Sequence, residues 1–199
     1  MNKIGILGMS LAILVAFLPG DAAAQSAERP KRSHRWAVYG GIGPSVYLNN
    51  LEVAADRVKP VNYSFVARLM WEPEYFLSLG LETGYNQLYT MSGSHPATGD
   101  VRIVNAVVPL QGVISMRFSE HFYGNFNLGF GILLNNVSTT QLGDFDASVM
   151  SMGDFAAAFG YRRNMTDRFT LGGELRGYYS GKLQDRNVAL VVVAGYKIW

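Results

Sequence analysis

Cysteine is absent from the 199-residue chain, and charged residues are scarce at 16%. The lack of cysteine excludes disulfide bonds, thiol nucleophiles and zinc sites built on thiolates. The net charge is only +2, and basic and acidic residues are interleaved, so nothing indicates a nucleic-acid partner. What the chain has instead is 49% hydrophobic residues, 13% aromatic residues and 22 glycines. Such a composition is short of charge for a surface that faces water.

The N-terminus has the pattern of a secretory signal peptide. Lys3 precedes an apolar stretch from Ile4 to Pro19, and Ala22-Ala23-Ala24 offers a cleavage site of the A-x-A type. An uncleaved membrane anchor is the alternative, but the apolar stretch is short and small residues follow it. We therefore predict a signal peptide over 1–24, a polar periplasmic lead-in over 25–35 and a single domain over 36–199.

The C-terminal stretch from Asn187 to Trp199 alternates strictly between two faces. Every second residue from Val188 to Ile198 is apolar, and a period of two predicts a β-strand. Because the strand ends on an aromatic residue, it has the form of the closing strand of an outer-membrane barrel. We predict an assembly signal formed by Tyr196, Ile198 and Trp199, and we expect Lys197 to face the interior or the periplasmic mouth.

The same alternation recurs along the mature chain. With the C-terminal strand, the number of expected strands is eight, and each has one apolar face and one face rich in small or polar residues. The eight expected strands are Trp36–Leu48, Val61–Glu72, Leu77–Tyr89, Val104–Phe118, Phe122–Asn135, Val149–Arg162, Phe169–Ser180 and Asn187–Trp199.

The connections between these strands alternate between short charged turns and longer loops. The longer ones, 49–60, 92–100 and 138–147, are rich in Gly, Ser, Asn, Asp or Pro. Short turns at one end and long loops at the other are the layout of outer-membrane barrels. The predicted fold is therefore all-β, an eight-stranded antiparallel up-and-down transmembrane β-barrel. Pro109 cannot donate to a strand ladder, so we expect a bulge or a missing ladder bond there.

The apolar faces of the strands are expected to meet lipid and the polar faces the lumen. A soluble barrel such as a lipocalin would need a charged exterior, which this chain lacks. On this assignment Tyr89 and Val149 lie on the lipid face with the other apolar residues of their strands. Aromatic residues near the short turns predict a periplasmic girdle of Trp36, Trp71, Phe76, Phe118, Phe122 and Phe169. Tyrosines near the long loops predict a second girdle of Tyr47, Tyr63, Tyr89 and Tyr179.

The chain resembles the small eight-stranded outer-membrane β-barrels of the OmpA/OmpX type. The stretch VVPLQGVISMRF, from Val107 to Phe118, resembles a strand of the porin-like barrel proteins common in Bacteroidetes. The resemblance covers the chain from about Trp36 to Trp199. It implies a bacterial outer-membrane location, contact with outer-membrane lipid and lipopolysaccharide, and delivery by periplasmic chaperones and the barrel assembly machinery.

Charged residues on the polar faces predict an ion-pair network in the lumen. Unpaired buried charges are very costly, so these groups are expected to pair and to plug the barrel. A small gated pore through the pairs is the alternative, although an eight-stranded interior is only wide enough for side chains. The predicted network consists of Arg68, Glu72, Glu82, Arg117, Asp154, Arg162, Glu174, Arg176 and Lys197.

No catalytic residues, metal sites or cofactors are predicted. An enzyme is the alternative class, because barrels that deacylate or palmitoylate lipid A use a Ser, a His and an acid near the outer rim. His95 with Ser92, Ser94 and Asp100 is the candidate for such a site, but the His-x-Ser-Asn strand motif of the deacylases is missing. Metal clusters, phosphate-binding loops and dinucleotide fingerprints are absent from the sequence. The remaining class is a structural or surface-interaction protein that binds or adheres through its external loops, with the extracellular ligand left open.

Overall fold

A computed structural model describes residues 35–49, 58–73, 76–95, 99–140 and 143–198. All of them belong to one compact unit, Arg32–Trp199. The expected signal peptide lies outside the described residues, as does the lead-in apart from Arg35, which begins the first strand. The strands are β1 (Arg35–Tyr47), β2 (Val58–Lys59), β3 (Val61–Glu72), β4 (Leu77–His95), β5 (Gly99–Arg117), β6 (Phe122–Thr139), β7 (Gly143–Asn164), β8 (Phe169–Tyr179) and β9 (Arg186–Lys197).

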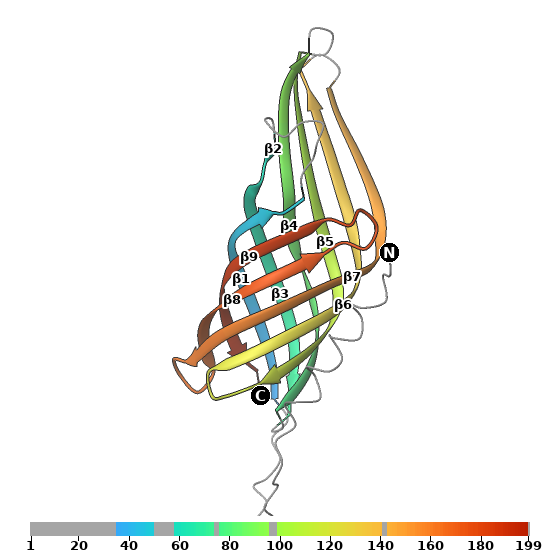
Figure 1. Cartoon of the computed structure of the whole chain (residues 1–199). Coiled ribbons are helices and arrows are strands. Elements are labelled where there is room, and N and C mark those ends of the chain that lie inside the picture. The colour runs from blue at the N-terminus through green and yellow to red at the C-terminus, as the bar shows by residue number, and fades with distance from the viewer. Residues whose placement is uncertain (1–34, 50–57, 74–75, 96–98, 141–142, 199) are drawn as a thin grey trace, which may run out of the picture. The chain divides into compact units, whose positions relative to one another are not determined.

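The strands form one antiparallel sheet that closes on itself. The order is β2-β4-β3-β1-β9-β8-β7-β6-β5, and β5 also pairs with β4, so all strands except the two-residue β2 form a ring of eight (Figure 1). Closure gives each long strand a partner on both sides, which a sheet needs in lipid. The predicted eight-stranded antiparallel β-barrel is confirmed. Among the described residues, no helix is both long and apolar enough to span a membrane.

The strands differ strongly in length, and the long ones adjoin each other. Strands β4 to β7 have 18 to 22 residues, whereas β1, β3, β8 and β9 have 11 to 13. The hairpins β4–β5 and β6–β7 therefore rise beyond the rest of the barrel as one four-stranded wall (Figure 1). The expectation of long loops over 92–100 and 138–147 was wrong, because strand pairing continues to His95 with Gly99 and to Thr139 with Gly143.

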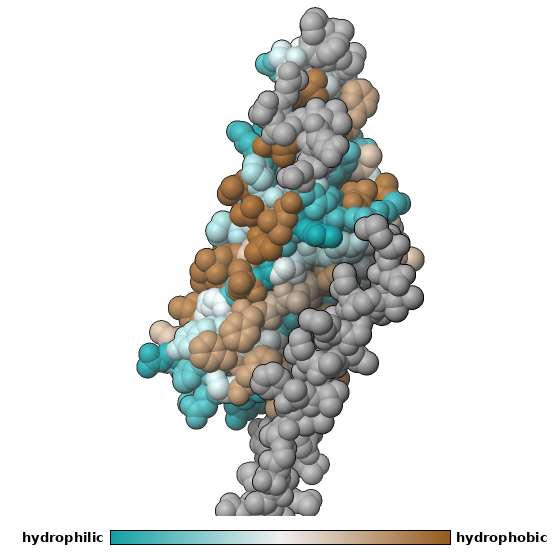
Figure 2. All heavy atoms as spheres, in the orientation of Figure 1, coloured by the Kyte–Doolittle hydropathy of each residue, from teal (hydrophilic) through white to brown (hydrophobic). Residues whose placement is uncertain are grey.

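The outer surface of the barrel carries the apolar side chains. Residues such as Phe65, Leu81, Phe126 and Leu190 are 44 to 61% exposed, and apolar side chains cover much of the middle of the face seen in Figure 2. At the short-turn end, five of the expected girdle residues are 39 to 66% exposed and Trp71 is half-buried. The exposed five are Trp36, Phe76, Phe118, Phe122 and Phe169. This surface is suited to lipid rather than to water.

Two β-bulges change which residues face the interior. In β4, Leu88 is the extra residue, because Gln87 and Tyr89 pair with successive residues of β5. In β7, Gly153 is the extra residue, because Met152 and Asp154 pair with successive residues of β6, and its φ is +75°. A bulge adds a residue and reverses the alternation beyond it. Tyr89 therefore packs against the interior, and Val149 pairs with the buried Leu133. The lipid-facing prediction for both residues was wrong.

The expected second girdle is only partly formed. Tyr63 is 51% exposed on the outside, whereas Tyr47 is buried in the lumen with its ring 5.1 Å from that of Tyr89. Tyr47 joins an apolar cluster in the upper lumen, which we call the upper core. The upper core consists of Tyr47, Leu88, Val107, Leu133, Ala156 and Tyr178.

Two prolines interrupt ladders of the ring. The pairing of β4 with β5 stops at Thr83–Leu110 and resumes at Asn86–Val107, so Pro109 lies in a gap, as expected for a residue without a backbone donor. The pairing of β1 with β9 skips Gly43 and Pro44 in the same way. The ladder that closes the ring is thus short and interrupted.

Candidate functional site: the polar interior of the barrel

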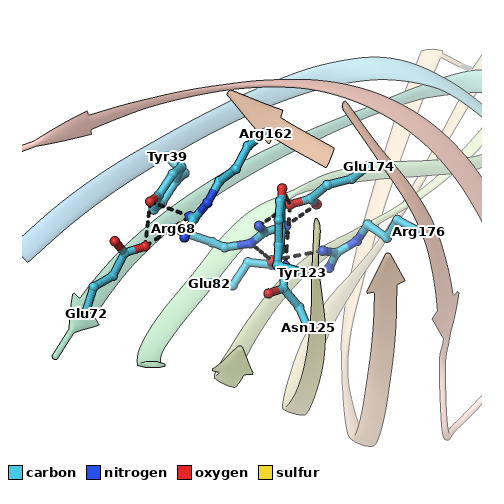
Figure 3. Close-up of polar contacts among 9 residues, drawn as sticks. All are labelled: Tyr39, Arg68, Glu72, Glu82, Tyr123, Asn125, Arg162, Glu174 and Arg176. Carbon is cyan, nitrogen blue, oxygen red and sulfur yellow. Dashed lines mark hydrogen bonds and ion pairs between the residues drawn. The ribbon is translucent and has the colours of Figure 1, made fainter. Parts of the chain in front are cut away.

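Four charged residues form the centre of the lumen, and we call them the central cluster. Arg68 donates through Nη1 and Nη2 to the two carboxylate oxygens of Glu174, each at 2.5 Å, and through Nε to Glu82. Arg176 donates to both carboxylate oxygens of Glu82, at 2.9 Å from Nη1 to Oε2. All four side chains are at most 3% exposed. Two cations and two anions compensate each other among buried side chains in the centre of the lumen (Figure 3).

The central cluster spans the lumen from wall to wall. Glu82 lies on β4 and Arg176 on β8, which are opposite members of the ring of eight. Arg68 on β3 reaches Glu174 on β8 in the same layer. Tyr123 donates its hydroxyl to Glu174 Oε1 at 2.5 Å. The side chains thus connect opposite walls and occupy the barrel axis.

A second charged group lies toward the short-turn end. Glu72 Oε1 accepts hydrogen bonds from the Tyr39 hydroxyl at 2.6 Å and from Arg162 Nη1 at 3.0 Å. Arg162 also lies over the rings of Tyr39 and Tyr123, 5.3 and 4.9 Å from their centroids. Arg117 is half exposed and reaches Glu72 only at 3.9 Å. The barrel therefore carries an ion pair at its periplasmic mouth, below the central cluster.

Two residues of the predicted network lie outside these pairs. Lys197 is half-buried and pairs with the fully buried Ala37, so it lies on the inner side at the periplasmic mouth, and its Nζ donates to Asn164 Oδ1 at 3.1 Å. Asp154 is fully buried but has no cation among the described residues. Its carboxylate accepts from the hydroxyls of Ser151 and Tyr178 and, at 2.9 Å, from the backbone N–H of Gly181. Asp154 thereby connects β7 to β8 and to the turn after it.

The turn between β8 and β9 lies at the extracellular rim of the barrel. Asp185 in this turn accepts hydrogen bonds from the Tyr47 hydroxyl and from Asn49 Nδ2. Burial raises the pKa of the Asp185 carboxyl above its usual range, although the hydrogen bonds from Tyr47 and Asn49 act in the opposite direction. The turn is therefore attached to β1 across the rim.

The tyrosines of the interior were missed as site residues. Tyr39, Tyr123 and Tyr178 each donate a hydroxyl to a buried carboxylate. Their signal in the sequence was an aromatic residue on the polar face of a strand, where Gly, Ser and Asn prevail. A phenol satisfies a carboxylate without adding charge, so such residues are plausible partners wherever carboxylates outnumber nearby cations.

The residues of the expected assembly signal lie at the closure of the ring. Tyr196 is 47% exposed and Ile198 is 42% exposed. The backbone N–H of Ile198 donates to the carbonyl of Trp36 at 2.7 Å. Trp199 lies outside the described residues. The C-terminus therefore adjoins the beginning of β1.

The residues weighed for catalysis lie at the tip of the β4–β5 hairpin. Ser94 pairs with Asp100 and Ser92 with Arg102 in the ladder. Ser92 and Asp100 line a hollow that opens to solvent, together with Arg102 and Thr140. Among the described residues, no group of three or more His, Asp or Glu side chains could hold a metal ion.

Comparison with known proteins supports the fold. No protein-family model matches the chain, and no curated protein matches its sequence. Ail, the attachment invasion locus protein of Yersinia pestis, is 14% identical and has a similar structure with a TM-score of 0.52, over 83% of this chain and 99% of Ail. Neisserial surface protein A is 14% identical, with a TM-score of 0.47 over 82% of this chain and 97% of its own. The chain thus has the fold of the small eight-stranded β-barrels of bacterial outer membranes.

Proposed function

We propose that the chain is an integral outer-membrane protein with a closed lumen, which acts at the cell surface through its two long hairpins. The observation that carries this proposal is the central cluster, because Glu82 and Arg176 join opposite walls of the ring. An ion passing through would have to break buried ion pairs, and separating such a pair leaves an uncompensated charge. The upper core and the Asp185 turn add two further layers across the same lumen.

Planar-bilayer conductance of the purified protein tests the closed lumen. We expect no single-channel steps for the wild type, whereas Glu82→Ala combined with Arg176→Ala removes the span and should raise the frequency of openings. A matched double variant on the wall, Asp144→Ala with Asp146→Ala, should remain silent. Regular conductance steps from the wild type would contradict a closed lumen.

A narrow hydrated path is the second candidate, because several interior amides lack protein partners. The side-chain nitrogen and oxygen of both Gln111 and Asn127 are buried without a hydrogen bond among the described residues. The same holds for Nε of Arg176. Buried polar groups need partners, which water entering the lumen would supply. The conductance experiment decides between this path and the closed lumen.

The surface role is proposed from the wall formed by β4 to β7. The wall extends beyond the other strands, and extended elements on a rigid scaffold commonly carry recognition. The structure of Ail is known with the heparin analogue sucrose octasulfate. The exposed charges of this wall are mainly acidic, with Asp100, Asp144 and Asp146 against Arg102, so we do not propose a sulfated glycan as the ligand. Contact with lipopolysaccharide, and delivery by chaperones and the assembly machinery, follow from the proposed location.

We propose that the protein is not an enzyme. The Ser92, Ser94 and Asp100 side chains lie on an exposed hairpin tip rather than in an enclosed site at the membrane rim. Lipid A from cells with and without the protein should have the same mass. A change in acyl count that disappears in His95→Ala would contradict this proposal.

A further inference from the structure

The two faces of the wall reverse their polarity above the barrel. Within the barrel the inner face is polar, as at Arg68 and Glu82, and the outer face is apolar. In the ladders of the wall, directly paired residues share a face. The row Val107–Leu133–Val149 begins in the upper core, which identifies the inner face. Four residues farther along each strand, beyond the row Asn105–Asn135–Ala147, the row Ile103–Val137–Phe145 lies on the same face.

This inner face is apolar and partly uncovered. Phe145 is 57% and Val149 43% exposed, and Ile103 and Val137 are half-buried. Met91 extends the face onto β4, where it pairs with Ile103. The upper core forms its floor, so the face ends in a closed base.

The outer face of the same wall is polar. Asp144 pairs with Ser138 and Asp146 with Asn136, and all four side chains are exposed or half-buried. An outer polar face is expected where a wall leaves the membrane and enters water. An inner apolar face at the same height has no such explanation, and exposed apolar surfaces of this kind commonly bind a partner.

The apolar inner face is continuous with the lipid-facing surface. β7 pairs with β8 only from Phe155 onward, and the turn after β8 bonds to Ser151 and Asp154, so residues 143–150 have a described strand partner on the β6 side alone. At this open side, Met152 is 72% and Leu183 46% exposed. Met152 lies on the outer face, paired with Phe130, and Val149 and Phe145 lie on the inner face, so apolar side chains flank this edge on both sides.

An added strand is a poor occupant for this open side. A bulge at Gly153 bends the free edge of β7 at its base, and Asp144 and Asp146 place charge along it. Bulges and edge charges are the features that discourage strand addition. The paired amides Asn105 and Asn135 interrupt the apolar face, and Asn105 points to a small ligand instead, because its Oδ1 is buried without a hydrogen-bond partner among the described residues.

We propose that the inner face of the wall binds an uncharged single-chain amphiphile, such as a long-chain alcohol. Its apolar chain lies along Ile103, Phe145 and Val149, and its hydroxyl group donates to Asn105 Oδ1. The site rests on the proposed surface role of the hairpins and does not depend on a closed lumen. A barrel that conducts ions would leave this site in place.

Photolabelling tests this site in the wild-type protein in phospholipid nanodiscs. The probe is dodecanol that carries a diazirine near the end of its chain, and adducts are mapped by mass spectrometry. We expect adducts at Phe145 and Val149 in addition to the lipid belt. Excess unlabelled dodecanol should reduce the adducts on the inner face at least fivefold and leave those at Leu128 in the belt unchanged.

Neighbouring residues on opposite faces of β5 provide matched variants. Ile103→Asn should reduce labelling at Phe145 at least fivefold, whereas Val104→Asn on the outer face should leave it unchanged. Both variants should retain heat-modifiable gel migration, and the wild-type competition experiment stands whether or not they do. Labelling confined to the belt, inner-face adducts that do not respond to competition, or cross-links between two chains through Val149 would each overturn the proposal.

Discussion

Removal of Arg68 gives the sharpest test of the central cluster. Arg68 is the cation that contacts both acids, so Arg68→Met leaves Arg176 on Glu82 and leaves Glu174 with only uncharged partners such as the Tyr123 hydroxyl. The cluster changes from neutral to a net charge of one negative unit. Breaking a buried ion pair on one side costs about 3–5 kcal/mol. We expect the free energy of unfolding to fall by that amount in urea titrations of the protein in phospholipid vesicles, followed by tryptophan fluorescence.

A second substitution separates charge from packing. Arg68→Met combined with Glu174→Gln leaves the neutral Arg176–Glu82 pair. The double variant should therefore recover about half or more of the free energy of unfolding lost in Arg68→Met, because buried ion pairs are often replaceable by neutral groups. Asp146→Asn on the exposed wall should change the stability by less than about 0.5 kcal/mol. If Arg68→Met and Asp146→Asn have equal effects, the cluster is solvated and the reasoning for a closed lumen is refuted.

Three further perturbations address the rim, the close contacts of the ring and its assembly. The raised pKa of Asp185 favours its neutral form in the folded state, so stability should fall as pH rises from about 4 through that pKa, and Asp185→Asn should abolish this dependence in urea titrations between about pH 4 and 7. A Cβ at Gly195 would lie 2.3 Å from the Tyr39 ring, so Gly195→Ala should cost about 1–3 kcal/mol, whereas Gly40→Ala, with open space at its Cβ, should cost far less. Deletion of Trp199 should lower the heat-modifiable fraction recovered from membranes, and an unchanged fraction would exclude it as an assembly signal.

The strands and their faces could be predicted from the sequence because alternation is a local property. Arg68, Glu82, Glu174 and Arg176 lie on the polar faces of their strands, which identifies them as interior residues. Their pairing depends on ring closure, which puts β4 opposite β8 and has no local signal. The sequence could therefore indicate which charges share the lumen, but not which ones meet.

The errors have two physical causes. A bulge reverses the alternation, so the bulges near Leu88 and Gly153 moved Tyr89 and Val149 to the inner face. The second cause is composition, since the ends of the long hairpins are rich in Gly, Ser, Asn and Asp and resemble loops. Pairing with adjoining strands overrides that local preference, as strand propensity depends strongly on context.

The gap in the β1–β9 ladder determines where we expect the barrel to open first. β1 has 13 residues and β9 has 12, and the ladder between them has a gap at Gly43 and Pro44. The ladder between β6 and β7 is uninterrupted from Thr139 to Phe130, and it continues from Gly129 beyond the bulge. Opening a barrel requires only one ladder to separate along its full length. We expect a pulled or chemically unfolded barrel to part between its first and last strands, and the β4–β7 wall to be the last element that retains protected amide hydrogens.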